Sequence, residues 1–466
     1  MKGTFSLLFI LLSIHSIGQH EVALKDSCHK DDVHSLFDFV SKGHTSGHIR
    51  NYFMATINEG DLKDYWTNAT GGAVYYETAE WKGFAWGVKG IFTYKTFSSD
   101  LNEIDTLVGK GAKWEKELYD ITRPEEARDL DRLEELFLRY RWGESHVSVG
   151  KIDINRGPLL LRRDGRMKPF VFRGAWAEIR SRENSDWYVG LIEGVSPRGM
   201  TEWYTINQAI GLSNNGFLYD GTKADYHEAA RSKGIAVLGY KGQVSKPLTL
   251  QVWNYYFHYL TNVTWTQLDI DKDRWFGGFQ YVHQMADPHQ STLEFEKRYY
   301  QPNETGNVFN VQAGWKSSNG AVRLSGAYLK ALNTGRFLFS KELGRENFYV
   351  SQPRSWIDGF GNVQVYQVRM KWRGQNKWLR NLSTDLRIQR VEAPDPDDFQ
   401  FNKYGRTSYF QSTVLVNYHF KKAFEGLKLT LLYVGRYTEP AFEMSYTDVF
   451  YNTNFSHLNV ILNVEF

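Results

Sequence analysis

Apolar and polar side chains alternate along most of the chain in runs of about ten residues, the length of a tilted strand that crosses a membrane. The run from 457 to 466 is the most regular. One face of this run is wholly apolar: Leu458, Val460, Leu462, Val464 and Phe466. The other face carries His457, Asn459, Ile461, Asn463 and Glu465. Because successive side chains of a strand point to opposite sides, this run predicts a strand with one face toward lipid and one toward water.

The same alternation occurs in four earlier segments, residues 135–142, 366–373, 411–420 and 427–437. In each segment one face is apolar or aromatic, and the other face carries basic or other polar side chains. A basic side chain that faces lipid at the bilayer midplane costs about 2–4 kcal/mol, so in a membrane barrel the polar faces must line the lumen. The alternative is a soluble protein, in which the apolar faces form the core and the charges are solvated.

The connections between these runs are of two kinds. Asn319-Gly320 and residues 373–376 are short and rich in turn residues. Others are long and polar: 100–132, 194–231 and 391–406. Part of the first long connection, residues 124–134, has a helical pattern. Short turns at one end and long loops at the other predict an all-β protein, a transmembrane antiparallel β-barrel of about 18 strands.

The N-terminal residues have the pattern of a secretory signal peptide. Lys2 is followed by the apolar run Phe5–Leu12 and by small residues before Gln19. An amphipathic anchor is the alternative. We expect a signal peptide over residues 1–18, a polar N-terminal segment over 19–45 and the barrel over 46–466.

Composition and charge exclude several classes of protein. Aromatic residues make up 16% of the chain, yet the mean hydropathy is −0.49, a combination that suits a barrel with aromatic girdles and a wet interior. The net charge of +3, from 56 basic and 53 acidic residues, gives no footprint for nucleic-acid binding. The single cysteine, Cys28, cannot form an intramolecular disulfide.

Two stretches of the sequence carry a family resemblance. One is Ser46-Gly-His-Ile-Arg-Asn-Tyr-Phe53, followed by Gly71-Gly72. The other contains Gly157-Pro-Leu-Leu160, Asp164-Gly-Arg-Met-Lys-Pro169 and Phe172-Arg-Gly-Ala-Trp176. Together they resemble the OprD family of substrate-specific outer-membrane porins.

The resemblance implies a multi-pass protein of the Gram-negative outer membrane, monomeric or loosely trimeric, in contact with lipid and lipopolysaccharide. It also implies that long extracellular loops fold partly into the lumen and narrow the channel. A charged insertion around residues 110–132 departs from the family pattern, so the geometry of these loops, and with it the substrate, stays open.

A ladder of basic side chains along the lumen wall is the first candidate site. A guanidinium can hold a carboxylate in a two-pronged hydrogen-bonded pair, and a series of such positions lets an anion step along a wall. The alternative is that these charges pair with lumen acids and only hold the wall together. The candidate residues are Arg139, Arg141, Arg369, Lys371, Arg373, Arg387, Lys428 and Arg436.

The loop that contains the second family-like stretch is the other candidate site. Arg162, Arg163, Asp164 and Arg166 lie close together in the sequence, and the resemblance places them at the constriction of the channel. A network of salt bridges within the loop is the alternative, and it is compatible with a role in the constriction.

These features predict a porin for the passive diffusion of small anionic or zwitterionic solutes, such as amino acids or organic acids. We expect no enzyme activity, cofactor or metal, because no serine-hydrolase elbow, phosphate-binding loop or zinc-protease motif is present. Two alternatives stay open. One is an outer-membrane hydrolase of the lipase or protease type with Ser, His and Asp at the barrel rim, and the other is a structural barrel with a plugged lumen.

Overall fold

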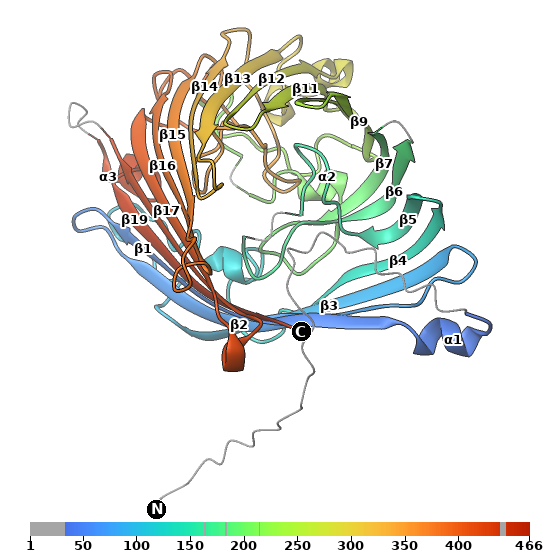
Figure 1. The fold of residues 1–466 in the computed structure, drawn as a ribbon. Helices are drawn as coiled ribbons and strands as arrows, with labels where there is room; N and C mark the ends of the chain where they lie inside the picture. Colours follow the sequence, from blue (N-terminus) through green and yellow to red (C-terminus); the bar gives the residue numbers. More distant parts are fainter. Residues whose placement is uncertain (1–32, 163–164, 182–183, 214, 439–443) are drawn as a thin grey trace, which may run out of the picture.

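The computed structural model describes residues 33–162, 165–181, 184–213, 215–438 and 444–466, and in this part of the chain nineteen strands form one antiparallel sheet (Figure 1). The predicted signal peptide, Cys28, Arg163 and Asp164 lie outside the described residues. The strands are β1 (His44–Asn58), β2 (Tyr65–Glu77), β3 (Phe84–Ser98), β4 (Arg132–Trp142), β5 (Ser145–Ile152), β6 (Val171–Ser181), β7 (Ser185–Ser196), β8 (Tyr204–Thr205), β9 (Ile235–Ser245), β10 (Leu248–Phe257), β11 (Thr261–Asp271), β12 (Trp275–Ala286), β13 (Thr305–Lys316), β14 (Val322–Ala331), β15 (Gln364–Arg373), β16 (Leu382–Glu392), β17 (Tyr409–His419), β18 (Leu427–Tyr437) and β19 (Phe455–Glu465).

The sheet closes on itself because β1 pairs with both β2 and β19. The closing pair runs in register from His48 opposite Glu465 to Asn58 opposite Phe455. The short strand β8 adds only to β7, which itself continues to β9. The wall of the described barrel therefore has 18 strands, and the predicted fold class is confirmed.

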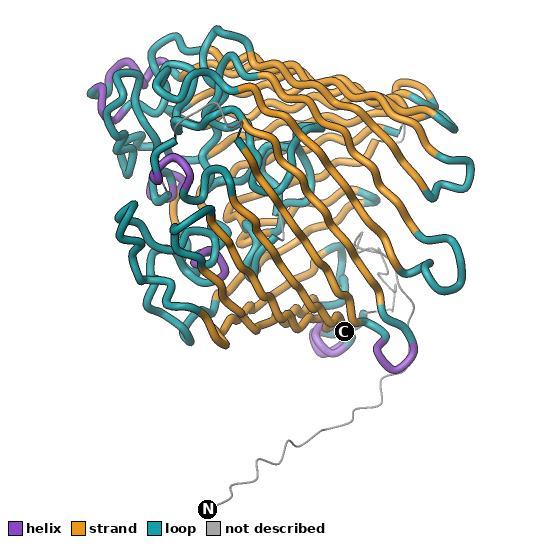
Figure 2. The backbone as a smooth tube through the Cα atoms, turned by 90° about the vertical axis from the view of Figure 1, so that its left-hand side faces the viewer, coloured by secondary structure: helices purple, strands orange, loops and turns teal. Residues whose placement is uncertain are grey.

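The two ends of the barrel differ, as the connections predicted. Figure 2 shows mostly short connections at one end, which we call the turn end, and long loops at the other, which we call the loop end; short helices lie at both ends. The chain termini of the barrel meet at the turn end, where the backbones of Gly47 and Phe466 exchange hydrogen bonds of 2.8 and 3.0 Å. The helices are α1 (Leu36–Ser41), α2 (Ile206–Ala209), α3 (Tyr446–Val449) and the 3₁₀ turns η1 (Lys116–Leu118), η2 (Pro288–Thr292), η3 (Phe295–Lys297) and η4 (Lys422–Phe424).

The helix expected over residues 124–134 does not form. The segment consists of turns and bends until β4 begins at Arg132. The carboxylate of Glu126 accepts hydrogen bonds from the backbone N–H groups of residues 127, 128 and 129. This local arrangement competes with the hydrogen bonds of a helix. None of the helices in the described part of the chain is long and apolar enough to span a membrane.

The strands bury one face and expose the other with the predicted parity. In β15, Val368 is 64% exposed while the neighbouring Gln367 is 4% exposed. In β19, His457 and Asn459 are fully buried and Leu458 is 39% exposed. The exposed face is apolar and the inward face carries the amides and charges, as expected for a barrel in lipid with a polar lumen.

Long loops from the loop end fold into the barrel and fill much of its interior. Leu118, Leu159 and Phe337 belong to three different loops, and all three are fully buried. Leu118 packs in a cluster against β1, β2 and β19, and the other two belong to a larger cluster that lines the strands from β4 to β17. The lumen is thus narrowed by packed loops, as the family resemblance implied.

Val368→Arg should lower the free energy of unfolding by about 2–4 kcal/mol, because it places a charge on the lipid face of β15. Thr430→Arg, at a position that lines the interior cavity, is the matched control and should cost clearly less. Urea unfolding of both variants in lipid bilayers measures the difference. Equal losses would contradict the assignment of the two faces.

Candidate functional site

A cavity of about 690 Å³ lies in the described part of the barrel, between the strands β11 to β19, β1 and the ingoing loops. Its lining is rich in hydrogen-bonding side chains, with amides such as Gln267, Gln280 and Gln312 beside aromatic residues such as Phe276. Among the described residues that line it, seven are basic: Arg166, Arg198, Arg323, Arg354, Arg369, Lys371 and Arg387. These cations fall into two groups, one on the barrel wall and one on the loops.

The wall group consists of Arg323 on β14, Arg369 and Lys371 on β15, and Arg387 on β16. Cross-strand register sets Arg369 opposite Arg387 and Lys371 opposite Asp385. Both arginines bind the Asp385 carboxylate, Arg369 with contacts of 2.5 and 2.9 Å and Arg387 with contacts of 2.9 and 3.1 Å. One acid on an inward position therefore neutralises part of the charge of this group.

Two members of the wall group lack such a partner. The Arg323 guanidinium lies over the Phe276 ring, 4.4 Å from its centroid. In the part of the chain that the structure describes, neither Arg323 nor Lys371 has a carboxylate within ion-pair distance. Their charges are therefore available to a solute that enters the cavity.

The loop group consists of Arg166, Arg198 and Arg354, which come from three different loops and surround Glu117. The Glu117 Oε2 atom lies 2.6 Å from Arg166 Nη2, 3.5 Å from Arg198 Nη2 and 4.0 Å from Arg354 Nη1. The group carries more positive charge than one carboxylate can balance.

The ionisation of Glu117 reflects this crowding. Burial alone would raise the pKa of Glu117, but Arg166, Arg198 and Arg354 together lower that pKa to about 2. Burial, followed by the neighbouring Arg166, lowers the pKa of Arg354 to about 9. The carboxylate is therefore ionised at neutral pH, and the arginines repel one another across it.

The other predicted ladder residues occupy inward positions outside the cavity lining. Arg373 and Lys428 lie near the turn end of β15 and β18. Arg436 is buried and is held by Gln411 and by the backbone carbonyls of Asn452 and Arg354.

Arg139 and Arg141 of β4 also point inward, near the turn end of the barrel. Arg139 pairs with Glu77 at 2.8 Å, and Arg141 pairs with Glu80 at 3.2 Å. These contacts match the alternative reading, in which lumen charges hold the wall together. Of the eight predicted ladder residues, the structure places Arg369, Lys371 and Arg387 in the cavity.

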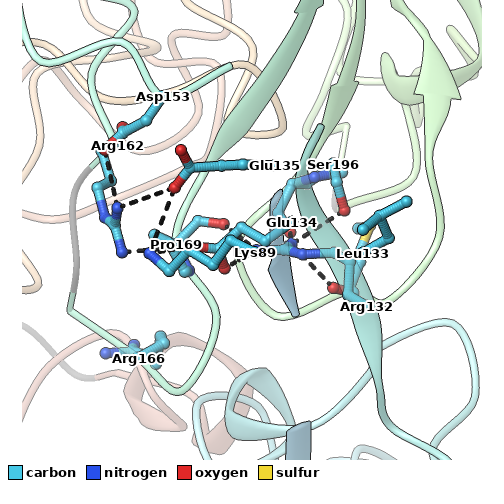
Figure 3. Close-up of polar contacts among 12 residues, drawn as sticks. Lys89, Arg132, Leu133, Glu134, Glu135, Asp153, Arg162, Arg166, Pro169 and Ser196 are labelled. Atoms are coloured by element: carbon cyan, nitrogen blue, oxygen red, sulfur yellow. Dashed lines mark hydrogen bonds and ion pairs between the residues drawn. The ribbon is translucent and has the colours of Figure 1, made fainter. Parts of the chain in front are cut away.

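In the predicted constriction loop, the two described residues have different surroundings. Arg166 lines the cavity and binds Glu117. Arg162 is directed toward the wall, where it lies 2.8 Å from Asp153 and 3.3 Å from Glu134 (Figure 3). Arg162 therefore anchors the loop, while Arg166 contributes to the cavity.

Glu134 is the centre of the buried network that anchors this loop. Its carboxylate accepts contacts from Lys89 at 2.9 Å, Arg132 at 3.1 Å and Arg162 at 3.3 Å (Figure 3). Arg132 also donates to the Ser196 hydroxyl and to the carbonyl of Pro169. The network thus joins β3 and β4 to the loop that carries Arg166 and to the end of β7.

Four residues of the site did not follow from the sequence: Glu117, Arg198, Arg323 and Arg354. Arg323 alternates with the exposed Leu324 on β14, so its inward position could have been read from the strand pattern. The other three lie on the connections between strands, Glu117 within the 3₁₀ turn η1, where no strand alternation indicates the direction of a side chain. Only the folding of these loops into the lumen brings them together.

A hydroxyl, a histidine and a carboxylate do meet in the lumen, but not in the order that a hydrolase needs. The Thr56 hydroxyl lies 2.8 Å from His457 Nδ1 and donates to Glu115 at 2.5 Å. The other ring nitrogen of His457 faces Arg354 rather than an acid. The acid therefore does not orient the ring, as it would in a catalytic triad. Within the described residues, no three metal-ligating side chains come together.

The closed wall, the apolar outer face and the loop-narrowed polar lumen define a membrane-spanning β-barrel with the architecture of a porin. No protein-family model matches the chain, and no curated protein sequence matches it. Solved structures do match in fold.

Acinetobacter baumannii OccAB4 aligns with a TM-score of 0.69 at 12% identity, over 91% of this chain and 98% of that one. Pseudomonas aeruginosa OccK9 (OpdG) aligns with a TM-score of 0.67 at 13% identity, over 92% and 99% of the two chains. P. aeruginosa OpdK, solved with vanillate, aligns with a TM-score of 0.63 at 14% identity, over 92% and 99%. All three are OprD/Occ porins, so the resemblance drawn from the sequence is confirmed at the level of the fold.

Glu134→Ala should lower the free energy of unfolding by about 3–5 kcal/mol, because the buried Lys89 and Arg132 and the partly exposed Arg162 lose their shared partner. Glu193→Ala is the control. It removes an exposed partner of Arg173 and should cost less than about 1 kcal/mol. Unfolding in urea, followed by tryptophan fluorescence, gives both values. Similar values for the two variants would show that the network does not anchor the loop.

The stability that Glu117 contributes should depend on pH in the direction of a lowered carboxyl pKa. The contribution is complete above the ordinary value of 4.5 and is lost as the pH falls toward 2. The difference in unfolding free energy between the wild type and Glu117→Gln should therefore shrink over this interval. A difference that stays constant from pH 6 to pH 2 would argue against the ion pairs with the arginines.

Proposed function

We propose that this protein is a passive channel of the Gram-negative outer membrane for small solutes that carry a carboxylate, such as organic acids or amino acids. The observation that carries the proposal is the cavity, where seven basic side chains face two pairing acids, Glu117 and Asp385. Such an excess of positive charge in a confined, low-dielectric space attracts anions and disfavours cations.

The chemistry of the lining suits a carboxylate in particular. The wall arginines Arg369 and Arg387 hold the Asp385 carboxylate with two contacts each, and this pairing supports the proposal that a solute acid binds in the same way. Lys371 and Arg323 extend this charge along the same wall. Neutral amides between the charges offer hydrogen bonds to the rest of the solute.

Passage through the channel also requires release. Binding has to be favourable on entry and weak enough for the solute to leave, which a series of partly neutralised positions provides. The structural neighbour OpdK was solved with vanillate, an aromatic carboxylate, which supports the same solute class here. We infer that the barrel works as a monomer or loose trimer in contact with lipid and lipopolysaccharide, without a cofactor or energy source.

Replacing Arg369, Lys371 and Arg387 with alanine together should reduce the anion preference of the channel by several-fold, because it removes three of the cations that face the cavity. The measurement is the reversal potential in a planar bilayer under a gradient of potassium benzoate. Arg390→Ala is the matched control, since Arg390 lies on β16 but on the exposed face, and it should leave the reversal potential unchanged.

An unchanged reversal potential in the triple variant would refute the assignment of the ladder. A folded wild-type protein that gives no conductance would refute the channel and favour the plugged structural barrel. Hydrolysis of a lipid or peptide substrate by that silent protein would favour the barrel enzyme instead.

A further inference from the structure

The connection between β3 and β4, residues 99–131, places one of its own carboxylates at the position where the channel attracts anions. The sequence in this region departs from the family-like pattern. The loop runs from the loop end into the lumen, where Trp114 and Leu118 pack in the cluster beside β1, β2 and β19. Glu117 lies between these two anchors and reaches the loop arginines of the cavity.

The backbone around Glu117 packs closely against the loop that carries Arg198. Gly199, next to Arg198, has a φ of +78°, and a Cβ atom at that position would lie 2.7 Å from the Glu117 carbonyl oxygen. The N–H group of Ile121 donates to the Gly199 carbonyl at 3.1 Å. On the opposite side, the Arg354 guanidinium lies 4.3 Å from the centroid of the Trp114 ring. The loop that carries Glu117 is therefore fitted against two of the three arginines.

Glu117 contacts the arginines as a bound solute acid would. A single oxygen, Oε2, takes hydrogen bonds from both Nε and Nη2 of Arg166, at 3.0 and 2.6 Å. Arg198 and Arg354 stand farther off, at 3.5 and 4.0 Å. The three guanidinium groups thus keep capacity for a second anion, but the best-placed one is already engaged.

We propose that Glu117 is a specificity-determining residue, a tethered competitor that weakens the binding of solute carboxylates at Arg166, Arg198 and Arg354. Glu117 neutralises part of the cluster and occupies the hydrogen-bonding positions of Arg166, so a passing acid binds there only weakly. The proposal rests on the proposed function, since it concerns the affinity of the same cavity for carboxylates. The Glu117 carboxylate thereby allows a bound solute to leave, because a cluster of three arginines without an acid would retain an anion.

The low pKa of Glu117 supports this role, since the competitor stays ionised throughout the physiological range. Glu115, two residues away, provides the contrast. Its carboxyl group is buried, accepts from Thr56 and from Tyr451 at 2.5 and 2.6 Å, and has a raised pKa because of that burial. Glu115 docks the loop, whereas Glu117 carries the charge that faces the arginines.

Glu117→Gln tests the proposal with benzoate as the probe. Benzoate block of single-channel current should occur at about tenfold lower concentration in this variant than in the wild type, because the arginines lose their internal carboxylate. Glu115→Gln is the matched control. Benzoate should block the current of this variant at the same concentration as in the wild type. Benzyl alcohol, a neutral probe of similar size, should bind the variant and the wild type equally.

An unchanged or weaker benzoate block in folded Glu117→Gln overturns the proposal. A gain for benzyl alcohol as large as the gain for benzoate also overturns it, because a merely wider lumen would explain both. If Glu117→Gln does not refold, Glu117→Asp replaces it. Asp keeps the charge but is one methylene shorter, and this substitution should strengthen benzoate block by about threefold. If benzoate blocks Glu117→Asp at the same concentration as the wild type, the proposal is overturned. A wild-type channel that does not select anions refutes the proposed function itself.

Discussion

The cost of leaving an ionised side chain without a partner inside a closed barrel shapes this molecule. Lipid disfavours charges on the middle of the outer face, whereas a charge such as Arg390 is tolerated near a strand end, so the strands turn many of their basic residues inward. Inside the barrel, several basic residues share acids: Lys89 and Arg132 of the strands and Arg162 of a loop share Glu134, and Arg369 and Arg387 share Asp385. Among the described residues, Arg323 and Lys371 have no acid within ion-pair distance, and both line the cavity on which the proposed function rests.

Charges that hold the wall and charges that line the cavity therefore differ by their place in the lumen rather than by residue type. Arg162 and Arg166 are neighbours in the sequence, yet Arg162 anchors the loop on the wall and Arg166 faces the cavity. Arg139 and Arg369 both point into the lumen, but Arg139 pairs with Glu77 near the turn end while Arg369 lines the cavity. The ladder predicted from the alternation of side chains along the strands therefore includes both charges that hold the wall and charges that line the cavity.

Strand parity nevertheless predicted much of the fold. The alternation in β15 and β19 correctly separated Val368 and Leu458 on the outer face from Gln367 and Asn459 on the inner face, because lipid imposes a strict period of two. The loops follow no such period. The position of Glu117 depends on how residues 99–131 pack against β1 and β19, and Arg198 and Arg354 reach it from distant loops. The helix expected over residues 124–134 failed for the same reason, since local turns and tertiary packing outweighed propensity.

We propose that this cavity binds carboxylates through its basic side chains. A crystal structure with 4-bromobenzoate tests it most directly, since the anomalous signal of bromine locates the ligand. We expect a bromine peak inside the cavity, with the carboxylate directed at Arg369 and Arg387 or at the arginines around Glu117. Bound ligand found only outside the barrel, or in the cavity with its carboxylate turned away from every arginine, would contradict it.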